Sequence, residues 1–364
     1  MVGEGAAGAS TAVGWVSPDG PVYNLTSTSK GMDYTRSTAK SWGREKLRGE
    51  WTTLVTPFTP DDELDERGLA ANIDRVAQLG TRGLGCSWNM GEFWSLTQAE
   101  RYRLMEFVPS VVKGRMLTAF QVTHTSLKEV VAMADAAQRA GFDLAIIAAP
   151  YIMTKTEAQV VDFVTKVSER TDLGLAFYNS PQFGITMSAA GLAKLADLPT
   201  MVAIKEASFN LQLSIDAHLL AGEKTVMSAP DEEIFFFEPF YGFHQQVMFA
   251  NTSDWRFDTP TSHEYVPFIE LATAGRLEEA RKLYPRIWPW KQLSRKWWSR
   301  IAARTGGGLP VQMVKYWGEL RGMSGGHVRP PVLPLTDAEK QELRADVESL
   351  AKPTARVVRT KATH

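Results

Sequence analysis

The sequence has little cysteine, almost no net charge and no long apolar run. Its single cysteine, Cys86, excludes an intrachain disulfide and fits a reducing, cytoplasmic setting. With 40 basic and 41 acidic residues the formal net charge is -1, so no global field draws the chain to a polyanion. No stretch approaches the roughly 18 consecutive apolar residues of a membrane span. We therefore expect neither a nucleic acid nor a membrane as partner.

Motifs for metals and common cofactors are also missing. The sequence has no nucleophile elbow, no Walker loop and no CxxC pair. No two of the six histidines have metal-ligand spacing on one predicted element. The sequence thus predicts no metal site and no cofactor. The histidines are His124, His218, His244, His263, His327 and His364.

What the sequence does contain is a repeated alternation of short apolar runs with longer stretches of helical period. Strands that are apolar on both faces, each followed by a helix, indicate a parallel sheet covered by helices. Eight such units favour a closed (β/α)₈ TIM barrel over a doubly wound open sheet, which is the alternative. The expected strands are 52–58, 83–88, 116–122, 144–150, 173–179, 201–207, 225–230 and 246–251.

Composition divides the rest of the chain. Residues 1–48 are rich in small residues and lack a sustained period, so we expect an N-terminal extension, part flexible and part packed on the body. The barrel is predicted to occupy residues 49–274. Residues 275–352 show only helical period and predict a C-terminal helical region, followed by a basic tail at 353–364.

One lysine interrupts an apolar strand. Lys205 lies in the segment Val202-Ala-Ile-Lys-Glu-Ala-Ser208, near the end of its predicted strand, and the strand ends of a parallel barrel carry its active site. Desolvation lowers the pKa of a buried lysine and leaves a neutral amine that can attack a carbonyl. The alternative is a structural lysine paired with Glu206 or another carboxylate, and position alone does not separate the two. Tyr178 closes the preceding strand, and a phenol there can shuttle protons.

The segments around these side chains resemble the dihydrodipicolinate synthase and N-acetylneuraminate lyase family of class I Schiff-base aldolases. This resemblance implies a TIM barrel with a C-terminal helical region, generally in a homotetramer. It also implies that Lys205 forms an imine with a 2-oxo acid, usually pyruvate, and that Tyr178 is the acid/base. The similarity covers about residues 49–350 and is carried by Thr53–Phe58, Gly91-Glu92, Phe177–Pro181, Val202–Ser208 and Val328–Thr336.

The departures from the family pattern concern the substrate. The family usually carries Gly-Thr-Thr-Gly-Glu after the second strand, where this chain has Trp88-Asn-Met-Gly-Glu92. Asn89 can donate hydrogen bonds but Met90 cannot, which weakens recognition of a carboxylate by this loop. The synthase's second tyrosine aligns with Ile152, and its arginine for the second substrate's carboxylate aligns with Phe183. These replacements favour apolar partners over charged ones.

Within the family, the hydratase-aldolases that cleave aryl-substituted 2-oxobutenoates match this character best. The sequence therefore predicts a class I, metal-independent lyase whose small-molecule partner is a hydrophobic or aromatic 2-oxo acid, with pyruvate and an aldehyde as products. The alternatives are a dehydratase or other imine-dependent lyase on a different carbonyl or sugar-acid substrate, and a barrel that only binds a ligand. The residues expected to bind substrate are Trp88, Asn89, Met90, Tyr151, Phe183 and Ala229.

Overall fold

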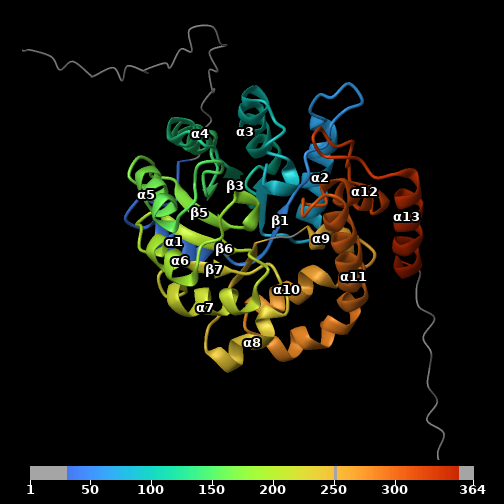
Figure 1. The fold of residues 1–364 in the computed structure, drawn as a ribbon. Helices are drawn as coiled ribbons and strands as arrows, with labels where there is room; N and C mark the ends of the chain where they lie inside the picture. Colours follow the sequence, from blue (N-terminus) through green and yellow to red (C-terminus); the bar gives the residue numbers. More distant parts are fainter. Residues whose placement is uncertain (1–30, 250–251, 352–364) are drawn as a thin grey trace, which may run out of the picture.

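The computed structural model describes residues 31–249 and 252–351, and at its centre lies a parallel eight-stranded sheet curled into a barrel (Figure 1). The strands follow the order β7-β6-β5-β4-β3-β2-β1-β8. The seam between the outer two is bridged where the Phe249 N–H donates to the Ser228 hydroxyl at 2.9 Å. This arrangement confirms the predicted TIM barrel. The strands are β1 (Gly49–Thr53), β2 (Gly83–Cys86), β3 (Leu117–Gln121), β4 (Leu144–Ala148), β5 (Gly174–Asn179), β6 (Met201–Glu206), β7 (Val226–Ser228) and β8 (Val247–Phe249).

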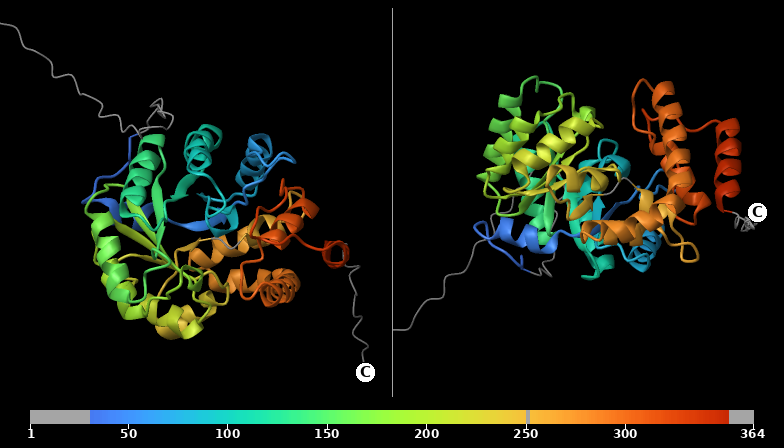
Figure 2. Two further views of the ribbon diagram at one scale, coloured as in Figure 1. Left: turned by 45° about the horizontal axis from the view of Figure 1, so that its top comes forward. Right: turned by 90° about the horizontal axis from the view of Figure 1, so that it is seen from below.

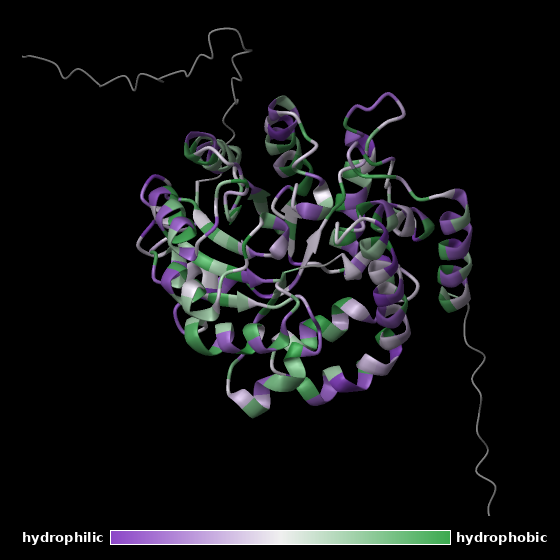
Figure 3. Cartoon of the chain, viewed as in Figure 1, coloured by the Kyte–Doolittle hydropathy of each residue, from purple (hydrophilic) through white to green (hydrophobic). Residues whose placement is uncertain are grey.

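Helices surround the barrel, as the left view of Figure 2 shows. Their apolar faces turn toward the strands and their polar residues lie outside, so hydrophobic and hydrophilic residues alternate along them in Figure 3. Local signals fix several ends: Thr97 and Glu100 form a capping box at the start of α3, and Gly141 ends α4 with a φ of 89°. The helices are α2 (Glu66–Gln78), α3 (Gln98–Val112), α4 (Leu127–Ala140), α5 (Glu157–Ser168), α6 (Ala189–Ala196), α7 (Leu211–Ala221), α8 (Ile234–Tyr241), α9 (Ser253–Phe257) and α10 (Tyr265–Thr273).

The first strand begins three residues earlier and ends five residues earlier than predicted. β1 begins at Gly49 and ends at Thr53, whereas the sequence predicted a strand over 52–58. The apolar run from Leu54 to Phe58 is buried but leaves the sheet. These apolar side chains pack in a loop beyond the end of the strand. The Arg329 guanidinium lies there, 3.9 Å from the centre of the Phe58 ring. The predicted strand was therefore wrong in position, because burial in a loop produces the same pattern as burial in a strand.

The described part of the predicted N-terminal extension packs on the bottom of the barrel. Helix α1 (Ala39–Lys46) contacts the start of β6, where a Cβ on Gly43 would lie 3.1 Å from the Val202 Cβ. The Tyr34 hydroxyl donates to the Asp143 carbonyl at 2.7 Å. These contacts lie at the N-terminal ends of the strands, opposite to Lys205. Residues 1–30, the last residues of the predicted eighth strand and the predicted basic tail fall outside the described residues.

Three further helices form a layer beside the barrel, coloured orange to red in Figures 1 and 2. They are α11 (Leu277–Arg304), α12 (Val311–Leu320) and α13 (Asp337–Ala351). Trp317 of α12 is fully buried and donates its ring N–H to the Arg256 carbonyl at 3.1 Å, which fixes α12 against α9. The C-terminal helical region therefore stands next to the loops that follow β8, and it supplies side chains to the upper end of the barrel.

Candidate active site

The C-terminal end of β6 places one lysine amine inside the barrel. Lys205 is only 7% exposed, and burial lowers its pKa from 10.5 to about 7, although the Glu50 carboxyl acts in the opposite direction. The Nζ atom lies 4.9 Å from the centre of the Trp88 ring and 5.0 Å from that of Tyr178. An amine with this pKa is neutral in a large fraction of molecules near neutral pH and is then a nucleophile.

The acid that follows this lysine in sequence leaves the strand on the other face. The Glu206 carboxylate accepts from the Ser208 N–H at 2.9 Å and from the Ser214 hydroxyl. Successive residues of a strand point to opposite sides of the sheet, so Glu206 faces α7 while Lys205 faces the barrel interior. This geometry disfavours the structural Lys205–Glu206 pair that the sequence left open.

Tyr178 lies beside Lys205 because β5 and β6 run parallel with these two residues directly opposite in the ladder. Its side chain is buried, and burial raises the pKa of the phenol to about 12, while a hydrogen bond with the Ser180 side chain acts in the lowering direction. The phenol is therefore protonated near neutral pH, and Ser180 offers a neighbouring group for proton exchange. The predicted neighbourhood of lysine and tyrosine is present in the structure.

Two glycines of β2 make room for tryptophans inside the barrel. A Cβ on Gly83 would lie 2.0 Å from the Trp51 ring, and one on Gly85 would lie 2.8 Å from the Trp88 ring. Only glycine therefore allows Trp88 to lie down over β2 and face the Lys205 amine. The two glycines therefore make space for the Trp51 and Trp88 rings.

Two contacts hold the loop after β2 in place, one with Thr56 and one with Lys315. Asn89–Gly91 form a single 3-10 turn, η1, and the Thr56 hydroxyl donates to the Gly91 carbonyl at 2.7 Å. The buried Glu92 carboxylate lies 2.6 Å from the Lys315 amine of α12. Asn89 and Met90 are consequently held at the upper end of the barrel, and the buried Oδ1 atom of Asn89 has no hydrogen-bond partner among the described residues.

Lys205 opens into a cavity of about 300 Å³, which we call the lysine chamber. Of the predicted site residues, it is lined by Lys205, Tyr178, Trp88, Asn89 and Met90. Further apolar walls come from segments far apart in the sequence. These walls are Phe209, Phe257, Trp298 and Leu309.

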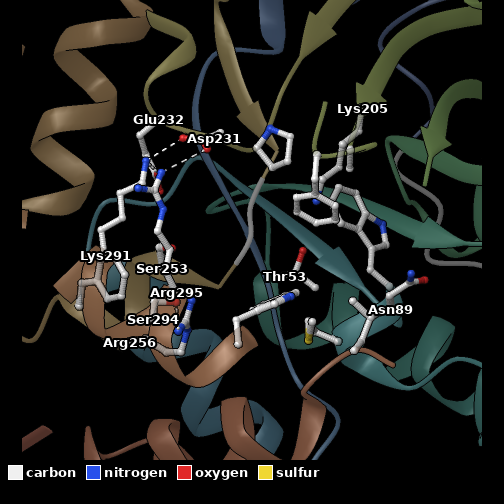
Figure 4. Close-up of a pocket in the computed structure, with 18 of the residues that line it drawn as sticks. Thr53, Asn89, Lys205, Asp231, Glu232, Ser253, Arg256, Lys291, Ser294 and Arg295 are labelled. Atoms are coloured by element: carbon white, nitrogen blue, oxygen red, sulfur yellow. Dashed lines mark hydrogen bonds and ion pairs between the residues drawn. The ribbon is translucent and has the colours of Figure 1, made fainter. Parts of the chain in front are cut away.

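The opposite side of the lysine chamber is charged, as Figure 4 shows. The Lys291 amine lies 2.7 Å from Asp231, 2.6 Å from Glu232 and 2.6 Å from Glu233. Burial lowers the pKa of Lys291, but the carboxylates outweigh it and hold the pKa above its usual value. Arg295 lies 2.8 Å from Glu233. The sequence predicted an apolar pocket and missed this cluster, although three acidic residues directly after a strand end were a usable signal.

A second cavity adjoins the first. It measures about 450 Å³ and shares Asn89 and Leu309 with the lysine chamber. We call it the aromatic chamber because Phe93, Trp94, Tyr151 and Phe183 line it. Tyr151 and Phe183, both predicted to bind substrate, therefore lie in this chamber and not in the one that contains Lys205. The centres of the Phe183 and Tyr178 rings are 5.6 Å apart, so the two chambers meet at this pair.

Ala229, the remaining predicted binding residue, lines neither chamber. Its N–H donates to the Gln245 side-chain oxygen at 2.6 Å, and its carbonyl accepts from the same carboxamide at 3.1 Å. These two bonds connect the end of β7 to the start of β8. The next residue, Pro230, lines the lysine chamber instead.

Two possible features are absent from residues 31–249 and 252–351. No group of three or more His, Cys, Asp or Glu side chains there could hold a metal ion. None of the helices in the same ranges combines the length and apolarity needed to cross a membrane. Cys86 is buried in β2, and burial raises the pKa of its thiol to about 12, so the thiol is not an activated nucleophile.

A TIM barrel with a buried amine and a tyrosine on adjoining strand ends defines the class: a class I aldolase-type lyase. The chain belongs to the dihydrodipicolinate synthetase family, whose sequence model matches residues 46–350. This match confirms the predicted family.

Curated relatives agree with this assignment. The 4-hydroxy-tetrahydrodipicolinate synthase of Methanothermobacter thermautotrophicus is 32% identical over 167 residues, which span 46% of this chain and 59% of that protein. The enzyme of the same name from Methanothrix thermoacetophila is 26% identical over 301 residues, or 82% of this chain and 95% of that protein.

A solved structure shows the same fold. YagE, a prophage protein of the dihydrodipicolinic acid synthase family from E. coli K12 in complex with pyruvate, superposes with a TM-score of 0.71. The superposition covers 84% of this chain and 98% of that one at 22% identity.

Proposed function

We propose that Lys205 forms an imine with a 2-oxo acid and that the chain cleaves or forms a carbon–carbon bond in a hydrophobic or aromatic substrate. The observation that carries this proposal is the buried amine itself, whose pKa of about 7 leaves it uncharged in a large fraction of molecules near neutral pH. An amine attacks a carbonyl only in its neutral form. Burial beside two aromatic rings thus supplies the reactive state without a metal.

The chemistry follows from this placement. The Lys205 amine adds to the 2-oxo carbon, and loss of water gives the imine. With an aryl-2-oxobutenoate, water then adds across the double bond and leaves a hydroxyl on the carbon that carries the ring. Loss of the proton from that hydroxyl breaks the adjacent carbon–carbon bond, which releases the aldehyde and moves the bonding electrons into an enamine. Protonation of the enamine and hydrolysis of the imine release pyruvate and restore the amine.

Tyr178 is the group we assign to the proton transfers. Its ring centre lies 5.0 Å from the Lys205 amine, and its phenol is protonated near neutral pH. It can give a proton to the departing water of the carbinolamine, and the phenolate that this leaves can take one from the substrate hydroxyl. The apolar preference is supported by Met90, Phe209 and Phe257 along the lysine chamber and by the rings of the aromatic chamber.

The test is turnover of benzylidenepyruvate. The purified protein should remove the conjugated absorbance and release benzaldehyde and pyruvate in equal amounts, and Lys205→Met should abolish the reaction. Tyr178→Ser, which removes the phenol, should slow the reaction by about 10²–10⁴-fold. Unchanged substrate with the wild-type protein at millimolar concentration would contradict the aromatic assignment.

A second candidate function is supported by the charged side of the lysine chamber. Arg256, Ser294 and Arg295 place hydrogen-bonding groups where a polyhydroxylated chain could bind. A dehydratase on a sugar-acid substrate would use the same Lys205 imine to expel water without carbon–carbon cleavage. Loss of one water from a 2-oxo-3-deoxy sugar acid, whose ketone can form the imine, with benzylidenepyruvate untouched, would favour this function. The cytoplasmic location and the homotetramer stay predictions.

A further inference from the structure

Among the described residues, two buried carboxamides that line the aromatic chamber have side-chain atoms without a hydrogen-bond partner. Gln312, in the first turn of α12, is 5% exposed, and neither its Nε2 nor its Oε1 has a hydrogen-bond partner among the described residues. Asn89, where the two chambers meet, is 4% exposed and has an unpartnered Oδ1. Both side chains line the chamber.

Leaving such groups unpaired is unfavourable. A buried amide atom without a partner costs about 1–3 kcal/mol, so most buried polar atoms in folded proteins are paired. Gln182 of the same chamber is exposed to solvent, and its Nε2 donates to the Gly307 carbonyl at 3.2 Å. Gln312 differs from Gln182 because its carboxamide is buried and has no partner among the described residues. A ligand in the chamber can therefore form hydrogen bonds with it.

The walls define the shape of that ligand. The Phe93 and Phe183 rings are nearly parallel, with an interplanar angle of 25° and centres 6.1 Å apart, and the Trp94 ring stands edge-on to Phe93. Flat aromatic groups pack favourably in such surroundings. No Lys, Arg, Asp or Glu of the described ranges lines the chamber, so a charged substituent would be buried there without a counter-ion from these residues.

We propose that the aromatic chamber binds the aldehyde half of the substrate and that Gln312 selects a flat, uncharged ring bearing a hydroxyl or carboxamide group. A carboxamide side chain offers one acceptor and two donors. Its complement is a neutral group that also donates and accepts, which an unsubstituted, methoxy or carboxylate ring does not provide. The proposal rests on the proposed function, since the reacting carbon must reach the Lys205 imine past Asn89, which lines both chambers.

The experiment compares aldehydes as condensation partners of pyruvate. The set is benzaldehyde, meta- and para-hydroxybenzaldehyde, para-formylbenzamide, para-methoxybenzaldehyde and para-carboxybenzaldehyde. The better hydroxyl or carboxamide compound should exceed benzaldehyde in kcat/KM by at least about tenfold, because benzaldehyde leaves the carboxamide unpaired. Gln312→Met should reduce that ratio to near one, and the matched Gln182→Met should keep it. No preference in the wild type, or a preference that survives in Gln312→Met, would overturn the proposal.

A binding measurement separates this proposal from the imine. In Lys205→Met, which cannot form the imine, calorimetry should show para-hydroxybenzyl alcohol or its meta isomer binding at least about tenfold tighter than benzyl alcohol. Gln312→Met in the same background should equalise the affinities. If pyruvate and borohydride leave Lys205 unmodified, the proposed function fails. The ratio of the two alcohols' affinities then decides by itself whether the chamber prefers a ring with a polar substituent. Equal affinities in the Lys205→Met protein would refute the role of Gln312.

Discussion

Replacing Lys205 with methionine should make the folded protein more stable at neutral pH. The shift of the Lys205 pKa from 10.5 to about 7 measures how strongly the barrel disfavours the charged amine. At 1.36 kcal/mol per pKa unit this corresponds to about 5 kcal/mol. Methionine keeps the apolar stem and removes the titrating group, but the polar contacts of the amine are lost with it. We therefore expect a net gain of about 1–3 kcal/mol in the free energy of unfolding at pH 7.

The shifted pKa of Lys205 also determines how the free energy of unfolding changes with pH. The folded-state pKa lies below the unfolded-state value, so between about pH 7 and 10.5 the unfolded chain binds the extra proton. The wild-type free energy of unfolding therefore rises through this window. The advantage of Lys205→Met should be greater at pH 7 than at pH 9, by up to about 2.7 kcal/mol. Urea unfolding followed by tryptophan fluorescence at the two pH values measures both quantities.

Lys315 provides the matched control. It is as deeply buried as Lys205, but its amine lies 2.6 Å from the buried Glu92 carboxylate. Lys315→Met would leave that carboxylate without its cation and should destabilise the fold by about 3–5 kcal/mol. A Lys205→Met protein that is less stable than wild type by the same amount at both pH values would refute the reasoning, because the amine would then be a charged structural group.

Three further predictions concern catalysis. The rate of borohydride trapping with pyruvate should rise about tenfold per unit below pH 7 and level off above it, since only the neutral Lys205 amine reacts; a rise that continues to pH 10 would contradict the lowered pKa. Tyr178→Phe should lower kcat for benzylidenepyruvate by about 10²–10⁴-fold, and an unchanged kcat would remove Tyr178 from the mechanism. Met90→Thr should raise the affinity for pyruvate severalfold in calorimetry by restoring a hydroxyl, whereas no change would show that this loop does not bind the carboxylate.

The pairing of Lys205 with Tyr178 could be predicted because it depends on one general rule. Parallel strands bring their C-terminal ends to the same edge, so residues that close consecutive strands become neighbours. Helices with strong local signals were equally accessible. Helix α3 (Gln98–Val112), for example, begins at the Thr97–Glu100 capping box, which is visible in the sequence.

Other parts of the site could not be read from local sequence. The charged side of the lysine chamber joins Asp231 after β7, Arg256 in α9 and Lys291 in α11, three segments that only the packing of α11 on the barrel brings together. Gln312 lies in an ordinary amphipathic helix, and its unpaired carboxamide becomes visible only when its surroundings are known. The division into two chambers, which separates Phe183 from Lys205, likewise depends on the packing of Asn89 and Leu309, which line both chambers.

The central claim is that Lys205 is the imine-forming residue, and peptide mapping after reductive trapping tests it most directly. The protein would be incubated with pyruvate and borohydride at pH 7.5, digested, and analysed by mass spectrometry beside a sample without pyruvate. We expect a single reduced pyruvate adduct on the peptide that contains Lys205, and none in Lys205→Met. An adduct on another lysine, or an unmodified Lys205 in the folded protein under saturating pyruvate, would contradict the account.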